Sequence, residues 1–155
     1  MSPTSPLTIY YDGSCQLCAS EIRNLSARAA PGRLVMVDCS PPGFDAAGLP
    51  ATQAQMMSLI HARDADENWL TGVDVFIAAY RAEGLGCVSR LLEHPRLRIH
   101  ADRLYPWVVR NRRRLSALGL HRILNFFTLR ATRANAERAA ANARARHLNQ
   151  CVEKT

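Results

Sequence analysis

The stretch LTIYYDGSCQLC, residues 7–18, decides the fold. Its apolar first half, Leu7–Tyr11, predicts a strand. A turn that carries a C-x-x-C pair follows this strand directly. Residues 15–30 follow with helical apolar spacing, and Pro31-Gly32 predicts the end of that helix. The two thiols are therefore expected on the first turn of a helix that directly follows a strand. That position favours redox chemistry over metal binding.

Cys15 is expected at or just before the first helical position, and Cys18 one turn later on the same face. Unpaired N–H groups and the helix macrodipole stabilise a thiolate there, which lowers its pKa from about 8.5. Because Gln16 and Leu17 carry no positive charge, we expect the helix end and a hydrogen bond between the thiols to lower it moderately. Cys15 is thus the expected exposed nucleophile and Cys18 the resolving thiol.

The residues between the strand and the thiols support two interpretations. Asp12 is a candidate catalytic residue, since a carboxylate at the end of a strand can accept a proton from Cys18. Alternatively, Asp12 and Ser14 organise the turn or cap the helix, and this is the interpretation we favour. Gly13 is expected to relieve backbone strain in the turn.

Length and composition indicate one globular domain with a real core and a possible appendage. The chain has 155 residues, of which 48% are hydrophobic and 21% charged. The N-terminus has no signal-peptide pattern, and no stretch approaches the roughly 18 apolar residues of a membrane span. We therefore expect a cytoplasmic protein without a membrane span, whose cysteines rest reduced. The predominance of Arg over Lys and the abundant Ala are typical of a high-GC bacterial genome.

The other cysteines give no second motif. Cys39 ends an apolar run and is expected to be buried filler, whereas Cys87 and Cys151 stay unassigned. A zinc site from Cys15, Cys18, Cys39 and one histidine is conceivable, but no second pair has ligand spacing. The histidines (His61, His94, His100, His121, His147) show no metal spacing either, and His61 is the one most expected to be buried. We predict no metal and no cofactor.

Charge is distributed unevenly along the chain. Residues 1–93 contain 6 basic and 10 acidic side chains, whereas residues 94–155 contain 14 basic and 3 acidic ones. The run Arg110-Asn111-Arg112-Arg113-Arg114, next to Tyr105 and Trp107, could contact a polyanion or anionic lipid. We favour the plainer interpretation, in which the aromatic residues pack on the core and the arginines form a solvated face; no specific nucleic-acid partner is expected.

The remaining pattern predicts a mixed sheet with helices on its faces. Strands are expected at 34–37, at 56–62 and around Trp69-Leu70, the last two joined by a polar turn over 64–68. Helices are expected from about 73 to Gly84, over 85–118 with Pro95 and Pro106 as break or start points, and over 121–150. The fold class is therefore α/β: a thioredoxin-like, mixed four-stranded sheet flanked by helices. We place the thioredoxin-like domain at 1–118 and a basic C-terminal helical extension at 119–155. The 121–150 helix of this extension is a candidate for a homodimer or partner contact.

Three blocks of sequence resemble a known family. The opening YYDGSCQLC resembles the D-G-x-C-x-x-C signature of the DCC thiol-disulfide oxidoreductases. LIHARDADENWLTGVDVFIAAYRAEGL and RLYPWVVRNRRRLSALG extend the resemblance over about residues 7–118. The resemblance implies a thioredoxin-like fold with Cys15 and Cys18 as the redox pair. One feature departs: thioredoxin-like proteins usually place a cis-proline just before the third strand, where Gln53-Ala54-Gln55-Met56 stands here.

Two functions follow as expectations. The first is a thiol-disulfide oxidoreductase that acts on a disulfide or thiol substrate, either a protein or a small molecule. The alternative is a non-enzymatic thioredoxin-like binding module, which uses its basic C-terminal helices to hold an acidic partner. A reactive thiol and a Cys15–Cys18 disulfide would distinguish the first from the second.

Overall fold

The computed structural model describes residues 6–119, so the expectations for residues 120–155, including the 121–150 helix, Cys151, His121 and His147, lie outside the described part. The chain divides into two compact units, Met1–His121 and Arg122–Thr155. The first unit contains all the elements described below.

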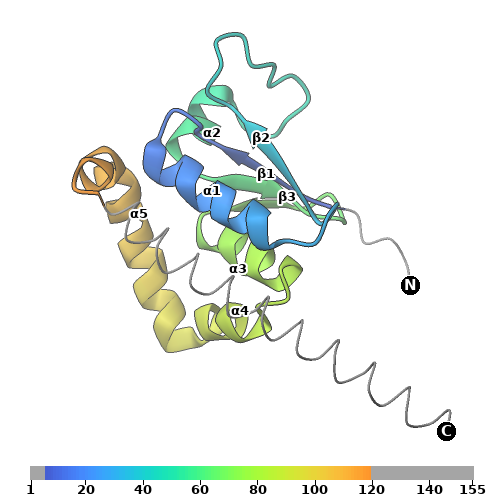
Figure 1. Ribbon diagram of the computed structural model, residues 1–155, viewed down its shortest axis with the longest axis vertical. Helices are drawn as coiled ribbons and strands as arrows, with labels where there is room; N and C mark the ends of the chain where they lie inside the picture. The colour runs from blue at the N-terminus through green and yellow to red at the C-terminus, as the bar shows by residue number, and fades with distance from the viewer. Residues whose placement is uncertain (1–5, 120–155) are drawn as a thin grey trace, which may run out of the picture. The chain divides into compact units, whose positions relative to one another are not determined.

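A four-stranded mixed sheet in the order β2-β1-β3-β4 forms the centre of this unit (Figure 1). β1 pairs in parallel with β2, and the intervening helix supplies the crossover that a parallel pair needs. β3 runs antiparallel to both β1 and β4. This is the thioredoxin-like arrangement that the sequence predicted. The strands are β1 (Leu7–Tyr11), β2 (Leu34–Asp38), β3 (His61–Arg63) and β4 (Trp69–Thr71).

Successive side chains of β1 point to opposite faces of the sheet and therefore belong to two separate cores. Leu7 and Ile9 pack with Ile22 and Leu25 of the first helix and with Val75 of the third. On the opposite face Tyr10 packs with a second group, made up of Cys39, Ala51 and Met56. The helices are α1 (Gln16–Arg28), α2 (Gln53–Ser58), α3 (Val73–Ala82), α4 (Gly86–Glu93) and α5 (Pro95–Ala117).

The expected strand at 56–62 is wrong in its first half. Residues 53–58 form α2, and β3 begins only at His61. The cause is a capping box, in which the Thr52 side chain accepts from the Gln55 backbone and the Gln55 side chain accepts from the Thr52 backbone. Residues 53–56 therefore belong to a helix, and the position just before β3 is Ile60, which is also not a proline.

α5 is one continuous helix along the side of the unit. Pro95 begins it, as expected, but Pro106 lies inside it and does not interrupt it. Arg98 anchors its first half to α3 through two bonds to the Asp74 carboxylate, of 2.6 and 3.0 Å. Its later half lies beside the start of α1 (Figure 1). None of the helices in residues 6–119 is long and apolar enough to cross a membrane.

Candidate active site

The site is built where two parallel strands end side by side. Gly13 follows β1, and its N–H donates a 2.9 Å hydrogen bond to Oδ1 of Asp38, the last residue of β2. A Cβ atom on Gly13 would stand only 2.1 Å from Asp38 Oδ2. Gly13 is not among the described glycines with positive φ, so the expected relief of backbone strain is not its role. It is required because the Asp38 carboxylate occupies the space of a side chain.

Asp12 organises the turn that leads to the thiols. Its side chain is buried, and Oδ1 accepts hydrogen bonds from both the backbone N–H (3.0 Å) and the hydroxyl (2.6 Å) of Ser14. Oδ2 accepts a 2.9 Å bond from Arg112. The turn-forming part of the sequence interpretation describes this geometry, but the helix cap is neither Asp12 nor Ser14: Cys15 itself is the N-cap of α1.

The two thiols form one hydrogen-bonded unit. The Cys15 sulfur accepts a 3.4 Å bond from the Cys18 backbone N–H and a second bond from the Cys18 thiol. The thiol bond is the largest cause that lowers the pKa of Cys15 to about 6; burial opposes it, while the Cys18 N–H and Arg112 act with it. The pKa of Cys18 is raised, because its proton is held in that bond and because partial burial disfavours the charged form. The depression at Cys15 is moderate, as the sequence predicted.

The relative exposure of the two cysteines is the reverse of the expectation. Cys15 is 6% exposed, whereas Cys18 is partly exposed. A thiol that precedes a helix is expected to be more exposed than one a turn further along. In the folded chain, however, the turn of residues 12–14 and the end of α5 meet around the start of α1.

Sequence reasoning missed Arg112 as a residue of the site. Its side chain is 17% exposed, and Nη2 donates to both Asp12 Oδ2 (2.9 Å) and the Met57 carbonyl (2.7 Å). Tyr105, seven residues earlier on the same face of α5, bonds to the backbone of Ile60. Two side chains of α5 therefore contact the segment that leads into β3.

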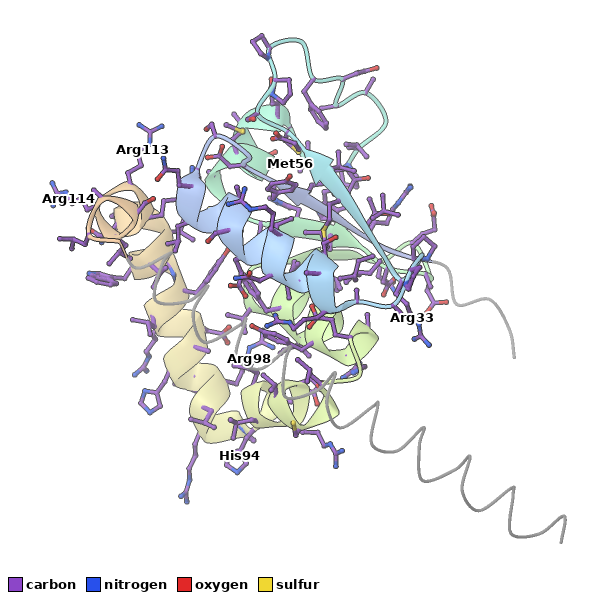
Figure 2. All side chains as sticks on the ribbon, in the orientation of Figure 1. Arg33, Met56, His94, Arg98, Arg113 and Arg114 are labelled. Atoms are coloured by element: carbon purple, nitrogen blue, oxygen red, sulfur yellow. The ribbon has the colours of Figure 1, made fainter. Side chains whose placement is uncertain are left out.

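The expected solvated face of arginines is wrong for Arg112, and the expected packing on the core is wrong for Trp107, which is 53% exposed. Arg113 and Arg114 do match it, since they point away from the rest of the unit (Figure 2). The signal that distinguishes Arg112 is its seven-residue spacing from Tyr105, which places one arginine of the run on the inner face.

Cys39, Cys87 and His61 are the other candidate residues of the sequence analysis that fall within residues 6–119 and carry sulfur or imidazole groups of interest. Cys39 is fully buried in the second core and Cys87 is exposed on α4. His61 is 6% exposed, as expected, and its ring nitrogen lies 2.8 Å from the Leu59 carbonyl. Within residues 6–119, no three His, Cys, Asp or Glu side chains come together as a metal site would require.

The chain is similar in sequence to known proteins. Residues 9–118 match the sequence model of a family described as DCC1-like thiol-disulfide oxidoreductase. A protein of Arabidopsis thaliana, described as uncharacterized and chloroplastic, is 32% identical over 103 residues, which are 64% of this chain and 47% of that protein. The chain thus spans about half the length of that relative. No solved structure matches the chain.

Proposed function

We propose that this chain, which belongs to the DCC1-like thiol-disulfide oxidoreductase family, exchanges disulfides through Cys15 and Cys18. The observation that carries the proposal is the pairing of the two thiols at the start of α1, where the Cys15 sulfur accepts hydrogen bonds from the Cys18 backbone N–H, at 3.4 Å, and from the Cys18 thiol. With a pKa of about 6, Cys15 is largely a thiolate at neutral pH, and the thiolate is the form that attacks disulfides. A cysteine with an ordinary pKa near 8.5 would be only a few per cent ionised there.

The proposed reaction has two exchange steps. The Cys15 thiolate attacks one sulfur of a substrate disulfide, forms a mixed disulfide with it and releases the other sulfur as a thiolate. Cys18 then loses its proton and attacks the Cys15 sulfur, which releases the second substrate thiol and leaves a Cys15–Cys18 disulfide. Two electrons pass from the cysteine pair to the substrate. An external thiol returns the pair to the reduced state by the reverse exchange.

The hydrogen bond also explains how Cys18 becomes reactive at the right moment. Its pKa is raised chiefly because its proton is shared with the Cys15 thiolate. Once Cys15 is part of a mixed disulfide, that negative charge is gone, and Cys18 ionises more readily. The departing substrate thiolate can take the proton. Both Asp12 oxygens already accept hydrogen bonds. This favours a structural role for Asp12 in the turn over a role in proton transfer.

The test is a redox titration of the full chain in glutathione buffers of graded ratio, with free thiols trapped by alkylation and located by mass spectrometry. We expect a Cys15–Cys18 disulfide in the wild type. Cys18→Ser should stop at a glutathione adduct on Cys15, and Cys15→Ser should form neither product. Cys87→Ser, which removes an exposed thiol on α4, is the matched control and should behave as the wild type. Failure of the wild type to form the disulfide at any ratio would leave only the binding-module interpretation.

A further inference from the structure

Arg112 of α5 is far from the thiols in sequence, but it brings a positive charge close to them in the fold. It lies 100 residues after Asp12 in sequence, yet the two side chains meet at 2.9 Å, and the Asp12 side chain is 4% exposed. The same nitrogen donates to the Met57 carbonyl at 2.7 Å. Arg112–Asp12 and Arg28–Glu83 both join a buried carboxylate to a mostly buried guanidinium, whereas the pairs of Arg63 and Arg81 are exposed.

We propose that Arg112 is a positioning residue of the redox site: it neutralises Asp12 beside the two thiols and thereby sets how readily Cys15 is held as a thiolate. The consequence for catalysis rests on the proposed disulfide exchange, whereas the effect on the thiol does not. The motif itself contains no cation, because Gln16 and Leu17 stand between the cysteines. α5 supplies the charge that the C-x-x-C segment lacks.

The groups around the thiols leave two charges to consider. In the described part of the chain, Arg112 and Asp12 are the charged side chains that act on Cys15 and Cys18, the first favouring the thiolate and the second opposing it. Tyr105 faces Cys18 as a neutral phenol, since burial raises its own pKa to about 12. Removing Arg112 would therefore do more than delete one favourable charge, because it would also leave the Asp12 carboxylate unneutralised next to the thiolate.

A role through charge and a merely structural role predict different signs for the shifts of the Cys15 pKa. If Arg112 acts through charge, Arg112→Met raises the Cys15 pKa and Asp12→Asn lowers it. The double variant should then return close to the wild type, because the two charges are removed together. If Arg112 only holds α5 in place, both single variants loosen the same contact and shift the Cys15 pKa in the same direction. The double variant would then not restore the pKa of the wild type.

The experiment measures the rate of Cys15 alkylation against pH in the full chain, resolved from the other thiols by mass spectrometry. We expect the midpoint, about 6 in the wild type, to rise in Arg112→Met, with severalfold slower alkylation at pH 6.5. Asp12→Asn should lower it, and the double variant should restore it. Arg113→Met, an exposed neighbour on α5, is the matched control and should not change the midpoint.

Two results would overturn the proposal: an unchanged midpoint in Arg112→Met, or a double variant that behaves as Arg112→Met does. Should Arg112→Met fail to fold, Arg112→Lys keeps the charge and should hold the midpoint near that of the wild type, whereas a large rise would contradict the charge argument. The glutathione titration adds a separate readout: Arg112→Met should contain more Cys15–Cys18 disulfide at the same ratio, because its thiolate is less stable. If the wild type forms no disulfide, the proposed function fails while the alkylation midpoints still decide the role of Arg112.

Discussion

At the scale of single residues, Cys18 governs the acidity of Cys15 more strongly than any other group does. Replacing it by alanine removes the thiol donor and leaves burial to act against the thiolate. In Cys18→Ala we therefore expect the Cys15 pKa to rise from about 6 towards its ordinary value. Alkylation of Cys15 at pH 6.5 should slow on the order of tenfold. The exposed Cys87, measured in the same digest, reports the intrinsic reactivity of the reagent. An unchanged rate at Cys15 would assign its lowered pKa to the Cys18 backbone N–H and Arg112, without the Cys18 thiol.

Gly13 is the second residue whose identity the site dictates. In Gly13→Ala the new methyl group would meet Asp38 Oδ2 at 2.1 Å, so the carboxylate must move and its bond to the residue 13 N–H is lost. We expect a loss of about 1–3 kcal/mol in the free energy of unfolding, measured in urea. Gly86→Ala is the control, because its nearest neighbour is the end of the Arg90 side chain at 3.8 Å. Equal stability of the two variants would contradict the packing argument.

At the scale of elements, α5 has an inner and an outer face that the sequence alone did not separate. Tyr105 points inward: its ring packs edge-on against that of Phe76, with the ring centroids 5.9 Å apart, and it bonds to the backbone of Ile60. Trp107, in contrast, is 53% exposed. Tyr105→Ala should cost about 2–4 kcal/mol of unfolding free energy and Trp107→Ala less than about 1 kcal/mol. Urea unfolding of both variants measures the difference. The reverse order would mean that Trp107, as the sequence analysis expected, is the residue that packs on the core.

The elements also differ in how well the sequence predicts them. β1, α1 and the thiol turn were predictable because an apolar strand, a motif and the Pro31-Gly32 stop follow one another without a gap. The third strand was misplaced because a short apolar run fits a helix as well as a strand, and the capping box at Thr52 decided between them. Arg112 was missed because the run of arginines by itself predicts a solvated face, and only the seven-residue spacing from Tyr105 separates Arg112 from its neighbours.

At the scale of the whole molecule, the proposed redox site depends on the global fold, since its groups come from the ends of β1, β2, α1, α2 and α5. The opposite end of α1 contributes to that fold through a buried ion pair. Arg28 Nε donates to Glu83 Oε2 at 3.0 Å, and the Glu83 side chain is fully buried. Its other oxygen, Oε1, has no hydrogen-bond partner among the described residues. Burial raises the pKa of Glu83 to about 7, although Arg28 opposes the rise.

This carboxylate should make the stability of the molecule depend on pH. The ordinary pKa of a glutamate side chain is 4.5, and the pKa of Glu83 in the folded state is about 7. Between these two pH values the folded state holds a proton at Glu83 that the unfolded chain has released. Stability from this group is therefore fully present below pH 4.5 and is lost as the pH rises to 7, by an amount of the order of 2 kcal/mol. Glu83→Gln cannot titrate, so the free energy of unfolding of the wild type should fall relative to that of Glu83→Gln across this window.

The measurement is urea unfolding of both proteins from pH 4.5 to 8, with the difference between them plotted against pH. Comparing the two proteins cancels the other titrating groups, including Cys15, whose lowered pKa acts in the opposite sense by adding stability as the pH rises above about 6. Glu93→Gln, which removes the exposed partner of Arg81, is the control for the loss of an exposed acidic side chain. A flat difference for Glu83→Gln would show that Glu83 is ionised throughout this range in the folded state. The Arg28 ion pair would then outweigh the burial of the carboxylate.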